Sequence, residues 1–594
     1  MANKTKLELT WIGKDQRPRL EPRILLEDPS KSFHAEQRFT EHDQFDNRLI
    51  FGDNLLALKA LEQEFTGKIK CVYIDPPFNT GQAMENYDDG LEHSIWLSLI
   101  KERLHVLHSL LADDGTMFVH IDDNELGYLI VLMDEIFGRS NRLYTITFRQ
   151  GSATGHKSIN PGCVNTTNFI LIYSKNKSSW NPNRVYTARE RDKRYSQFIL
   201  NPEEDYRKWK TCTLTEAFAR AESVEIKEAR AVAKKNPEKL DEFVLKHADS
   251  VIRFARPDYK GVSEAARKLI DKSKEKPNDV FLLERQGYSD MYFKSGERFL
   301  FYRDKLKVVD GKRVAGEPLT TLWQDLLSNN LHKEGGVKFP KGKKPEALIK
   351  RVLEIATDTG DWVLDSFGGS GTTAAVAHKM GRRWITIELG EHCHTHISPR
   401  LQRLVVGDDL DGVSKAVGWR GGGGFRYFTL APSLLEKDQF GNWIINKKYN
   451  KEMLVEALCK LEGFQYLPSE SVYWRHGHST ENDFIYVTTQ TLTKEQIQKL
   501  SDEVGPNRSL FICCGAFRIK NLEEFPNLTL KKIPRAVMAK CEWGKDDYSL
   551  EIKNLARAPE PEPDPDEPEK PKPKRRRAKP SDGQMGLFEM EGAE

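Results

Sequence analysis

Short apolar runs recur through the first 430 residues of the chain, and polar or glycine-rich turns follow them. Such runs predict buried strands, here at residues 49–51, 71–74, 117–119, 169–173, 362–364 and 384–387. Helical patterns lie between several of these runs, at residues 54–58, 125–137 and 372–380. The alternation of buried strands with helices predicts an α/β fold.

A glycine-rich turn follows the predicted strand at residues 362–364. Its sequence is Asp365-Ser366-Phe367-Gly368-Gly369-Ser370-Gly371-Thr372-Thr373. Glycines at a strand-to-helix turn let the backbone approach a nucleotide closely, because no Cβ stands in the way. No Lys-Ser/Thr pair follows the glycines, which argues against a phosphate-binding P-loop, and a purely structural tight turn remains an alternative. The next predicted strand ends at Glu388, where doubly wound folds can place an acidic residue against ribose hydroxyls.

A second segment, Asp75-Pro76-Pro77-Phe78, directly follows the predicted strand at residues 71–74. Each proline fixes φ and restricts the residue before it, so the turn holds a carboxylate and a ring rigidly at the sheet edge. Asp75 and the Pro76 carbonyl can accept both hydrogens of an exocyclic base amine and stabilise its positive charge during methyl transfer. Phe78 can stack on a base rotated out of the duplex, which returns about 1–3 kcal/mol of the flipping cost. A structural proline turn would explain the prolines but not the flanking Asp and Phe.

Together the two segments resemble the catalytic and cofactor motifs of the amino-DNA methyltransferases, in the permuted order of their beta class. Further matches are Leu49-Ile50-Phe51-Gly52-Asp53-Asn54, Ile136-Phe137-Gly138 and Lys344-Pro345-Glu346-Ala347-Leu348-Ile349. The resemblance is strongest to the modification subunit of type III restriction-modification systems and its solitary relatives, over residues from about 45 to 430. Ser366 and Gly369 stand where proline and alanine are common, and Phe78 where tyrosine is common, and none of these departures removes a functional group.

The resemblance implies S-adenosylmethionine as the methyl donor and a circularly permuted, Rossmann-like sheet in which the two motif strands are neighbours. It implies catalytic roles for Asp75, Pro76, Pro77 and Phe78. The implied cofactor-binding residues are Asp53, Lys344, Pro345, Asp365, Phe367, Gly368, Gly369, Ser370, Gly371, Thr372 and Glu388. Asp53 would contact the adenine of the cofactor, cap the helix that begins after it, or do both. Lys344 and Pro345 would precede a helix that covers the methionine end.

The expected domain organisation follows the changes in pattern along the chain. Residues 1–44 are expected to form a polar, irregular N-terminal arm, residues 45–175 the catalytic half of the methyltransferase domain and residues 336–432 its cofactor-binding half. Residues 176–335 change to charged helices, such as 225–235 and 262–274, and aromatic strands near 292–293 and 299–302, and the resemblance implies a target-recognition domain there. Residues 433–555 suggest a small α/β domain without readable chemistry, and residues 556–594 a disordered, Pro-rich tail.

Composition narrows the class of protein. The formal net charge is only +3, so any DNA-binding surface must be local. Eight cysteines in 594 residues are too few for a disulfide framework, which suits a reducing cytoplasm. No segment approaches the roughly 20 apolar residues of a membrane span, and the polar N-terminus is no signal peptide. The run His392-Cys393-His394-Thr395-His396 lacks a second ligand cluster, so we expect no metal.

The sequence therefore predicts a site-specific methyltransferase that acts on adenine N6 in duplex DNA by base flipping and direct displacement. Cytosine-N4 methylation is the rival within the class, although that activity usually has Ser in place of Asp75, and a catalytically inert DNA-binding or assembly subunit is the rival outside it. A bacterial, nucleoid-associated cytoplasmic location follows from the resemblance, and a homodimer or a helicase-nuclease restriction subunit is a candidate partner. Near the end of the tail, Gln584, Leu587 and Phe588 resemble the short motif by which bacterial replication and repair proteins bind the sliding clamp.

Overall fold

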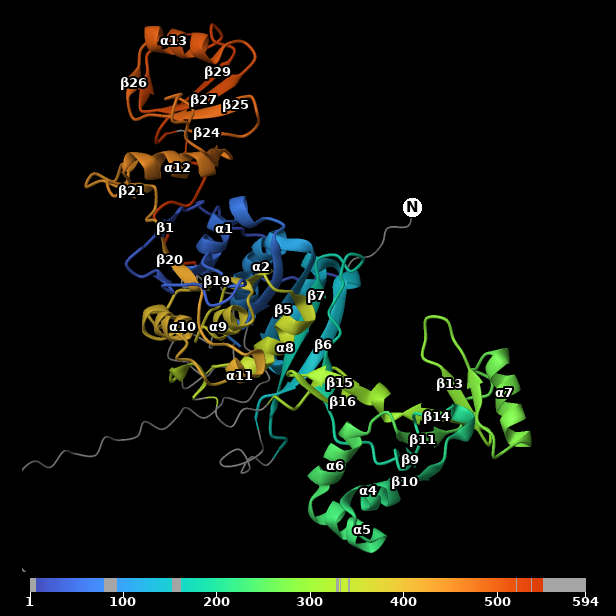
Figure 1. Cartoon of the computed structure of the whole chain (residues 1–594). Coiled ribbons are helices and arrows are strands. Elements are labelled where there is room, and N and C mark those ends of the chain that lie inside the picture. The colour runs from blue at the N-terminus through green and yellow to red at the C-terminus, as the bar shows by residue number, and fades with distance from the viewer. Residues whose placement is uncertain are drawn as a thin grey trace, which may run out of the picture.

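The computed structural model describes residues 7–78, 93–151, 162–326, 331, 333–339, 342–519, 521–535 and 537–548. Within these residues, the chain forms a central body around an eleven-stranded sheet, an inserted body drawn in green, and a C-terminal body drawn in orange (Figure 1). The tail and its clamp-like motif lie outside the described residues.

The central sheet is mostly parallel. In spatial order its strands are β1 (Leu25–Glu27), β20 (Gly424–Leu430), β3 (Asn47–Phe51), β19 (Arg383–Glu388), β18 (Trp362–Asp365), β4 (Ile69–Ile74), β5 (Leu111–Ile121), β7 (Thr167–Ser174), β6 (Arg142–Arg149) and β17 (Leu322–Trp323), and β2 (Phe33–His34) pairs with β20. From β20 to β5 neighbouring strands run parallel, whereas β7 runs antiparallel between β5 and β6. The Rossmann-like α/β prediction is confirmed.

The two motif strands, β4 and β18, are parallel neighbours, as expected. They are separated by almost three hundred residues, but Val363 pairs with Cys71 and Leu364 with Val72. Because the carboxyl ends of parallel strands share one sheet edge, the register brings Asp75 and the glycine-rich turn to the same edge.

Helices cover both faces of this sheet, which explains why its strands are apolar on both sides. On one face lie α1 (Asn54–Phe65), α2 (His93–Leu110) and α3 (Asp123–Met133), and on the other α8 (Glu346–Ala356), α9 (Thr372–Lys379) and α10 (Ser398–Val405). Side chains of β4 alternate between the two hydrophobic cores: Val72 and Ile74 join the first, and Cys71 and Tyr73 the second. Asp122 caps α3 by accepting a hydrogen bond from the backbone N–H of Asn124.

The inserted body contains its own six-stranded sheet. Its strands in spatial order are β10 (Thr211–Thr213), β9 (Gln197–Ile199), β11 (Val251–Ala255), β14 (Glu297–Phe301), β13 (Met291–Lys294) and β12 (Phe281–Leu283). Its helices are α4 (Leu214–Glu222), α5 (Ile226–Lys235), α6 (Pro237–Lys246) and α7 (Glu264–Glu275). A three-stranded sheet of β8 (Tyr186–Ala188), β15 (Leu306–Val309) and β16 (Lys312–Pro318) lies nearer the central body (Figure 1). The expected segment 176–335 also includes β17, which pairs with β6 of the central sheet.

The C-terminal body is a small α/β unit, as its pattern suggested. A five-stranded sheet has the order β23 (Gln465–Tyr466), β24 (Gly477–His478), β25 (Asp483–Val487), β27 (Ser509–Cys514) and β29 (Leu528–Lys532). The other elements are β21 (Leu435–Lys437), β22 (Trp443–Ile445), β26 (Thr491–Leu492), β28 (Ala516–Phe517), α12 (Lys451–Glu462) and α13 (Lys494–Val504).

The N-terminal segment is more ordered than its polar sequence predicted. Strands β1 and β2 extend the central sheet beside β20, and Ile24 is fully buried. The Arg23 side chain, 2% exposed, donates to the Ala431 carbonyl and pairs with Asp546, so it joins the arm to both ends of the C-terminal body. The expectation of an irregular arm is wrong for this part, because the isolated apolar residues find partners only in distant segments.

Candidate active site

The turn after β4 is held rigid by its own two prolines and by a side chain of α2. Two prolines restrict its backbone, and the Trp96 indole of α2 donates a hydrogen bond of 2.6 Å to the Pro77 carbonyl. Trp96 is itself fully buried. The side chains of Asp75 and Phe78 are therefore presented by a rigid segment at the carboxyl end of the strand.

The two carboxylate oxygens of Asp75 lie in different surroundings. Oδ2 is 2.5 Å from the Lys344 ammonium, whereas Oδ1 is buried without a hydrogen-bond partner among the described residues. The pKa of Asp75 is raised above its ordinary value, because the effect of burial outweighs the lowering effect of the Lys344 charge. An unpaired, buried acceptor is costly in a folded protein, which suggests that Oδ1 receives a donor from a bound molecule.

The Phe78 ring lies close to two side chains, those of His120 and Lys344. Its ring stacks on His120 at a centroid distance of 5.8 Å and an interplanar angle of 24°, and the Lys344 ammonium lies 4.9 Å from its centroid. The buried His120 ring is hydrogen-bonded by the Tyr73 hydroxyl and the Asn168 side chain. Burial holds the pKa of His120 well below its ordinary value, so the ring is neutral. Sequence reasoning missed His120, although a histidine inside the apolar run of β5 was a readable signal.

The glycine-rich turn closes on itself through backbone hydrogen bonds. The N–H of Phe367 donates to Asp365 Oδ1 at 2.9 Å, that of Gly368 to the Ile387 carbonyl at 3.0 Å and that of Gly371 to the Gly368 carbonyl at 2.7 Å. A Cβ at Gly368 would lie 2.6 Å from the Thr386 methyl, so no larger residue fits. At Gly369 (φ +53°) a Cβ would meet only the Phe367 carbonyl, which leaves the tip of the turn open for a ligand.

Glu388, the last residue of the neighbouring strand β19, holds this turn through backbone hydrogen bonds. Its Oε2 accepts the Gly369 N–H at 2.7 Å, its Oε1 accepts the Gly390 N–H at 2.9 Å, and His392 lies 3.0 Å from Oε1. The ribose contact expected for Glu388 stays a prediction, and its hydrogen bonds to the turn are a role that the sequence did not indicate.

Three carboxyl groups, those of Asp75, Asp365 and Glu388, gather at this edge. Burial, together with the nearby charges of Asp75 and Glu388, raises the pKa of Asp365 to about 8. Asp365 is therefore largely protonated at neutral pH, and the edge carries less negative charge than its sequence suggests.

A buried ionic network of Arg400, Glu346 and Lys379 supports the glycine-rich turn. Arg400, fully buried, donates to the Ser370 carbonyl at 2.9 Å and to Thr372 Oγ1 at 3.0 Å, and it pairs with Glu346 at 2.7 Å. Glu346 also pairs with the Lys379 ammonium at 2.8 Å. Pro345 precedes Glu346 as the N-cap residue of α8. The network was invisible in the sequence, because its members come from α8, α9 and α10.

The carboxylate of Asp53 is 1% exposed and already has protein partners. Its Oδ1 accepts the Leu56 N–H at 3.0 Å, which confirms the helix cap, and its Oδ2 lies 3.1 Å from the Tyr548 N–H and 3.5 Å from Arg103. The next residue, Asn54, donates to the Ser366 carbonyl at 2.8 Å. Asp53 thus lies next to the glycine-rich turn. A contact with the adenine of the cofactor would involve a carboxylate that already accepts hydrogen bonds from the protein.

No group of three His, Cys, Asp or Glu side chains in the described residues is arranged to hold a metal ion. The histidines at residues 392–396 instead contact protein groups: His392 pairs with Glu388, His394 with the Tyr427 hydroxyl and His396 with the Lys338 carbonyl. No helix in the described part of the chain combines the length and apolar character needed to cross a membrane.

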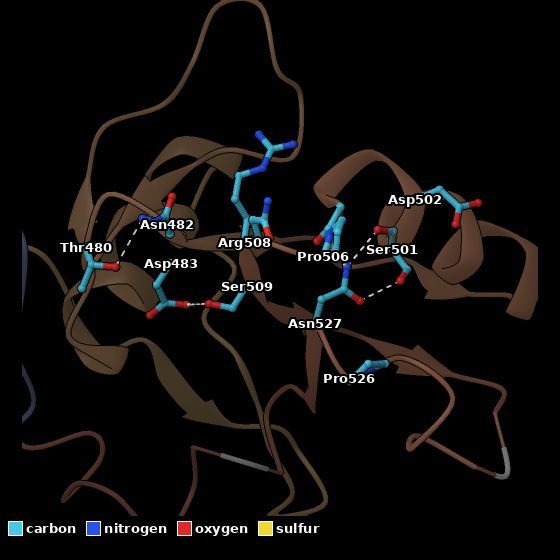
Figure 2. Close-up of a pocket in the computed structure, with 12 residues that line it drawn as sticks. Thr480, Asn482, Asp483, Ser501, Asp502, Pro506, Arg508, Ser509, Pro526 and Asn527 are labelled. Atoms are coloured by element: carbon cyan, nitrogen blue, oxygen red, sulfur yellow. Dashed lines mark hydrogen bonds between the residues drawn. The ribbon is translucent and has the colours of Figure 1, made fainter.

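A hollow of about 760 Å³ lies in the C-terminal body, lined by residues between Thr480 and Asn527 (Figure 2). Its polar side chains satisfy one another: Ser509 donates to Asp483 at 2.6 Å, and Ser501 to Asn527 at 2.7 Å. These hydrogen bonds hold the loops around the hollow in place, and the lining residues indicate no catalytic role.

Comparisons with known proteins agree on one class. A family model described as DNA methylase matches residues 69–398, more than half of the chain. The probable type III restriction-modification enzyme HindVI Mod subunit of Haemophilus influenzae is 35% identical over 427 residues, covering 67% of this chain and 55% of that relative. The EcoP15I Mod subunit of Escherichia coli is 27% identical, over 66% of this chain and 65% of that subunit. The type II methyltransferase M.EcaI of Enterobacter cloacae is 29% identical, over 58% and 66%. The chain thus spans between about half and two thirds of the length of these relatives.

Proposed function

Because the chain belongs to the DNA methylase family, we propose that it methylates adenine N6 in duplex DNA, with S-adenosylmethionine as the methyl donor. One observation carries the proposal: the unpaired Oδ1 of Asp75 lies at the same sheet edge as the glycine-rich turn after β18. A base amine and a nucleotide-bearing methyl donor could therefore meet there.

The residues at this edge fit S-adenosylmethionine. The turn is open at Gly369, whose backbone N–H donates to the Glu388 carboxylate. When bound, the cofactor supplies an electrophilic methyl group for direct displacement. The protein's own contribution is to hold the target amine: Asp75 Oδ1 and the Pro76 carbonyl accept its two hydrogens and stabilise the positive charge that grows on nitrogen.

Adenine is favoured over cytosine by the acidic residue of the catalytic motif. The resemblance associates cytosine-N4 transfer with Ser at the position of Asp75. An inert assembly subunit is disfavoured by the intact set of Asp75, Phe78 and the glycines, since an inert fold would have no reason to bury an unpaired carboxylate oxygen.

The decisive experiment is transfer of a radiolabelled methyl group to DNA by the purified chain, followed by sequencing that identifies the modified base and its site. We expect N6-methyladenine at one short sequence. The Asp75→Ala variant should lose nearly all transfer while S-adenosylmethionine binds within about an order of magnitude of the wild-type affinity. Full activity in this variant would contradict the role assigned to Asp75. N4-methylcytosine in the product would favour cytosine-N4 methylation over adenine-N6 methylation.

Target recognition is proposed for the inserted body, residues 176–335, in keeping with the position of this domain in the resembling family. Its aromatic and basic side chains suit contacts with base edges and phosphates. A restriction subunit is a proposed partner, because two of the relatives are named as Mod subunits of type III enzymes. A homodimer and a cytoplasmic, nucleoid-associated location in a bacterium are further proposals that rest on the resemblance alone.

We also propose sliding-clamp binding through Gln584, Leu587 and Phe588, which lie outside the described residues. A Pro-rich, charged segment has no folding reason to place Leu beside Phe, and such apolar anchors commonly insert into a partner's pocket.

A further inference from the structure

The ammonium of Lys344 pairs with the Asp75 carboxylate, although the resemblance implied that Lys344 binds the cofactor. The Nζ–Oδ2 distance is 2.5 Å, and the Lys344 side chain is 8% exposed against 19% for that of Asp75. Such a charge-assisted contact between two shielded groups restricts the rotation of the carboxylate. Since Oδ2 is held, Oδ1 has a defined position, and that is the oxygen without a partner.

Lys344 also touches the other two parts of the site. Its ammonium lies 4.9 Å from the centroid of the Phe78 ring, and its backbone carbonyl accepts a hydrogen bond of 3.4 Å from Thr372 Oγ1 in the glycine-rich turn. The following Pro345 fixes its own φ at −62° before α8 begins. One residue thus connects the catalytic turn, the candidate stacking ring and the candidate cofactor turn.

Among the residues that the structure describes, the other groups around Asp75 supply no compensating charge. Tyr73, on the same strand, has a pKa raised by burial, and His120 on β5 has a pKa held low by burial, so both are neutral. Asp365, at the end of β18, brings a second carboxyl group. In the described residues Lys344 is the cation that pairs with Asp75.

We propose that Lys344 is a positioning residue for methyl transfer, which keeps the Asp75 carboxylate ionised and aims its Oδ1 at the target amine. This inference rests on the proposed function, and it gives Lys344 a role different from cofactor binding. A protonated Asp75 would hold a proton where an amine hydrogen must be accepted, so the pairing maintains the acceptor that the reaction needs.

The test compares Lys344→Met, which removes the charge but keeps much of the length, with Lys344→Arg, which keeps the charge. Lys338→Met is the control, because the Lys338 side chain is exposed and His396 contacts the backbone carbonyl of this residue, which the substitution keeps. Burial raises the pKa of Asp75 and Lys344 lowers it, so removing Lys344 must raise it. Activity that needs the ionised form is lost as pH falls through that pKa. The acid limb of the pH–rate profile should therefore move upward by about 1–3 pH units in Lys344→Met.

At neutral pH we expect Lys344→Met to lower kcat by about tenfold or more, Lys344→Arg to keep the wild-type acid limb, and Lys338→Met to match the wild type. Calorimetric affinity for S-adenosylmethionine should change by less than about threefold in Lys344→Met, because the ammonium serves Asp75. An unmoved acid limb, or a loss of activity explained wholly by weaker S-adenosylmethionine binding, would overturn the inference.

Failure of the proposed function is distinguishable from failure of the pairing. If the wild-type chain transfers no methyl group to any DNA, the function is wrong, and the ionisation of Asp75 can still be measured by infrared difference spectroscopy. In a pH titration, the protonated-carboxyl band that Asp75→Asn removes should appear at higher pH in Lys344→Met than in the wild type, because Lys344 lowers the pKa of Asp75. The same titration midpoint in both proteins would contradict the pairing on its own.

Discussion

The backbone N–H of Tyr548 donates a 3.1 Å hydrogen bond to the carboxylate of Asp53, across 495 positions of sequence. The Tyr548 side chain, 8% exposed, packs into the same hydrophobic core as α1 and α2. The chain therefore returns from the C-terminal body to the central body and ends its described part beside the glycine-rich turn, because Asn54 bonds to Ser366.

Replacing Tyr548 with Ala should destabilise the central body by about 3 kcal/mol, the usual cost of removing a buried aromatic ring. Tyr548→Phe is the control, since it keeps the ring and removes the hydroxyl, which contacts Glu542 at 3.4 Å. We expect Tyr548→Phe to lie within about 1 kcal/mol of the wild type in urea unfolding. Equal stability of the Ala variant and the wild type would show that this segment does not stay docked in solution.

The glycine-rich turn offers a second test. Ala at residue 368 would place its Cβ 2.6 Å from the Thr386 methyl and 3.2 Å from the Ile387 carbonyl, so the turn must shift. We expect Gly368→Ala to weaken S-adenosylmethionine binding at least about tenfold and to cost about 1–3 kcal/mol of stability. Gly127→Ala in α3 is the matched control, because a Cβ there meets open space and Ala favours a helix by about 1 kcal/mol. Unchanged cofactor affinity in Gly368→Ala would place the cofactor elsewhere.

Phe78 should act as a flat surface and not through a polar group. Phe78→Tyr is therefore expected to be close to neutral, and Phe78→Ala to lose activity on duplex DNA. A mismatch at the target base lowers the cost of extruding it, so it should restore part of the activity of Phe78→Ala. Methyl transfer rates on matched and mismatched duplexes provide the measurement. An equal loss on both substrates would mean that the ring, stacked on His120, mainly supports the site.

The local patterns of the sequence were sufficient for the motif strands. Val72 and Ile74 face one core and Cys71 and Tyr73 the other, so their uninterrupted apolar run correctly indicated a strand buried on both faces. Contacts between distant segments were not readable. Arg400 supports the turn from another helix, and Arg23 looked like an ordinary polar residue of an arm until its partners at Ala431 and Asp546 were known. The sequence shows that a residue is charged, but it does not show which backbone carbonyls the side chain will contact in the fold.

Exchange of the inserted body should change the DNA sequence that is methylated and leave the chemistry intact. The structure sharpens the boundaries of the segment to exchange: β8 begins at Tyr186 and pairs with β16, which ends at Pro318, whereas β17 belongs to the central sheet. A chimera that replaces residues 186–318 by the matching segment of a relative therefore keeps every strand of that sheet. Sequencing of methylated DNA gives the new site. A folded chimera that still modifies the original site would place recognition outside this body.

The tail should bind the sliding clamp without affecting catalysis. A peptide of residues 581–594 contains Gln584, Leu587 and Phe588, and its affinity for purified clamp should be in the micromolar range, near about −8 kcal/mol, as is common for short anchors. Leu587→Ala with Phe588→Ala should remove binding, because the two apolar side chains supply the anchor, whereas the full chain with these changes should methylate free DNA at the wild-type rate. Tethering would then act only through a higher effective concentration on clamp-loaded DNA. Absence of clamp binding by both the wild-type peptide and the full chain would refute the proposal.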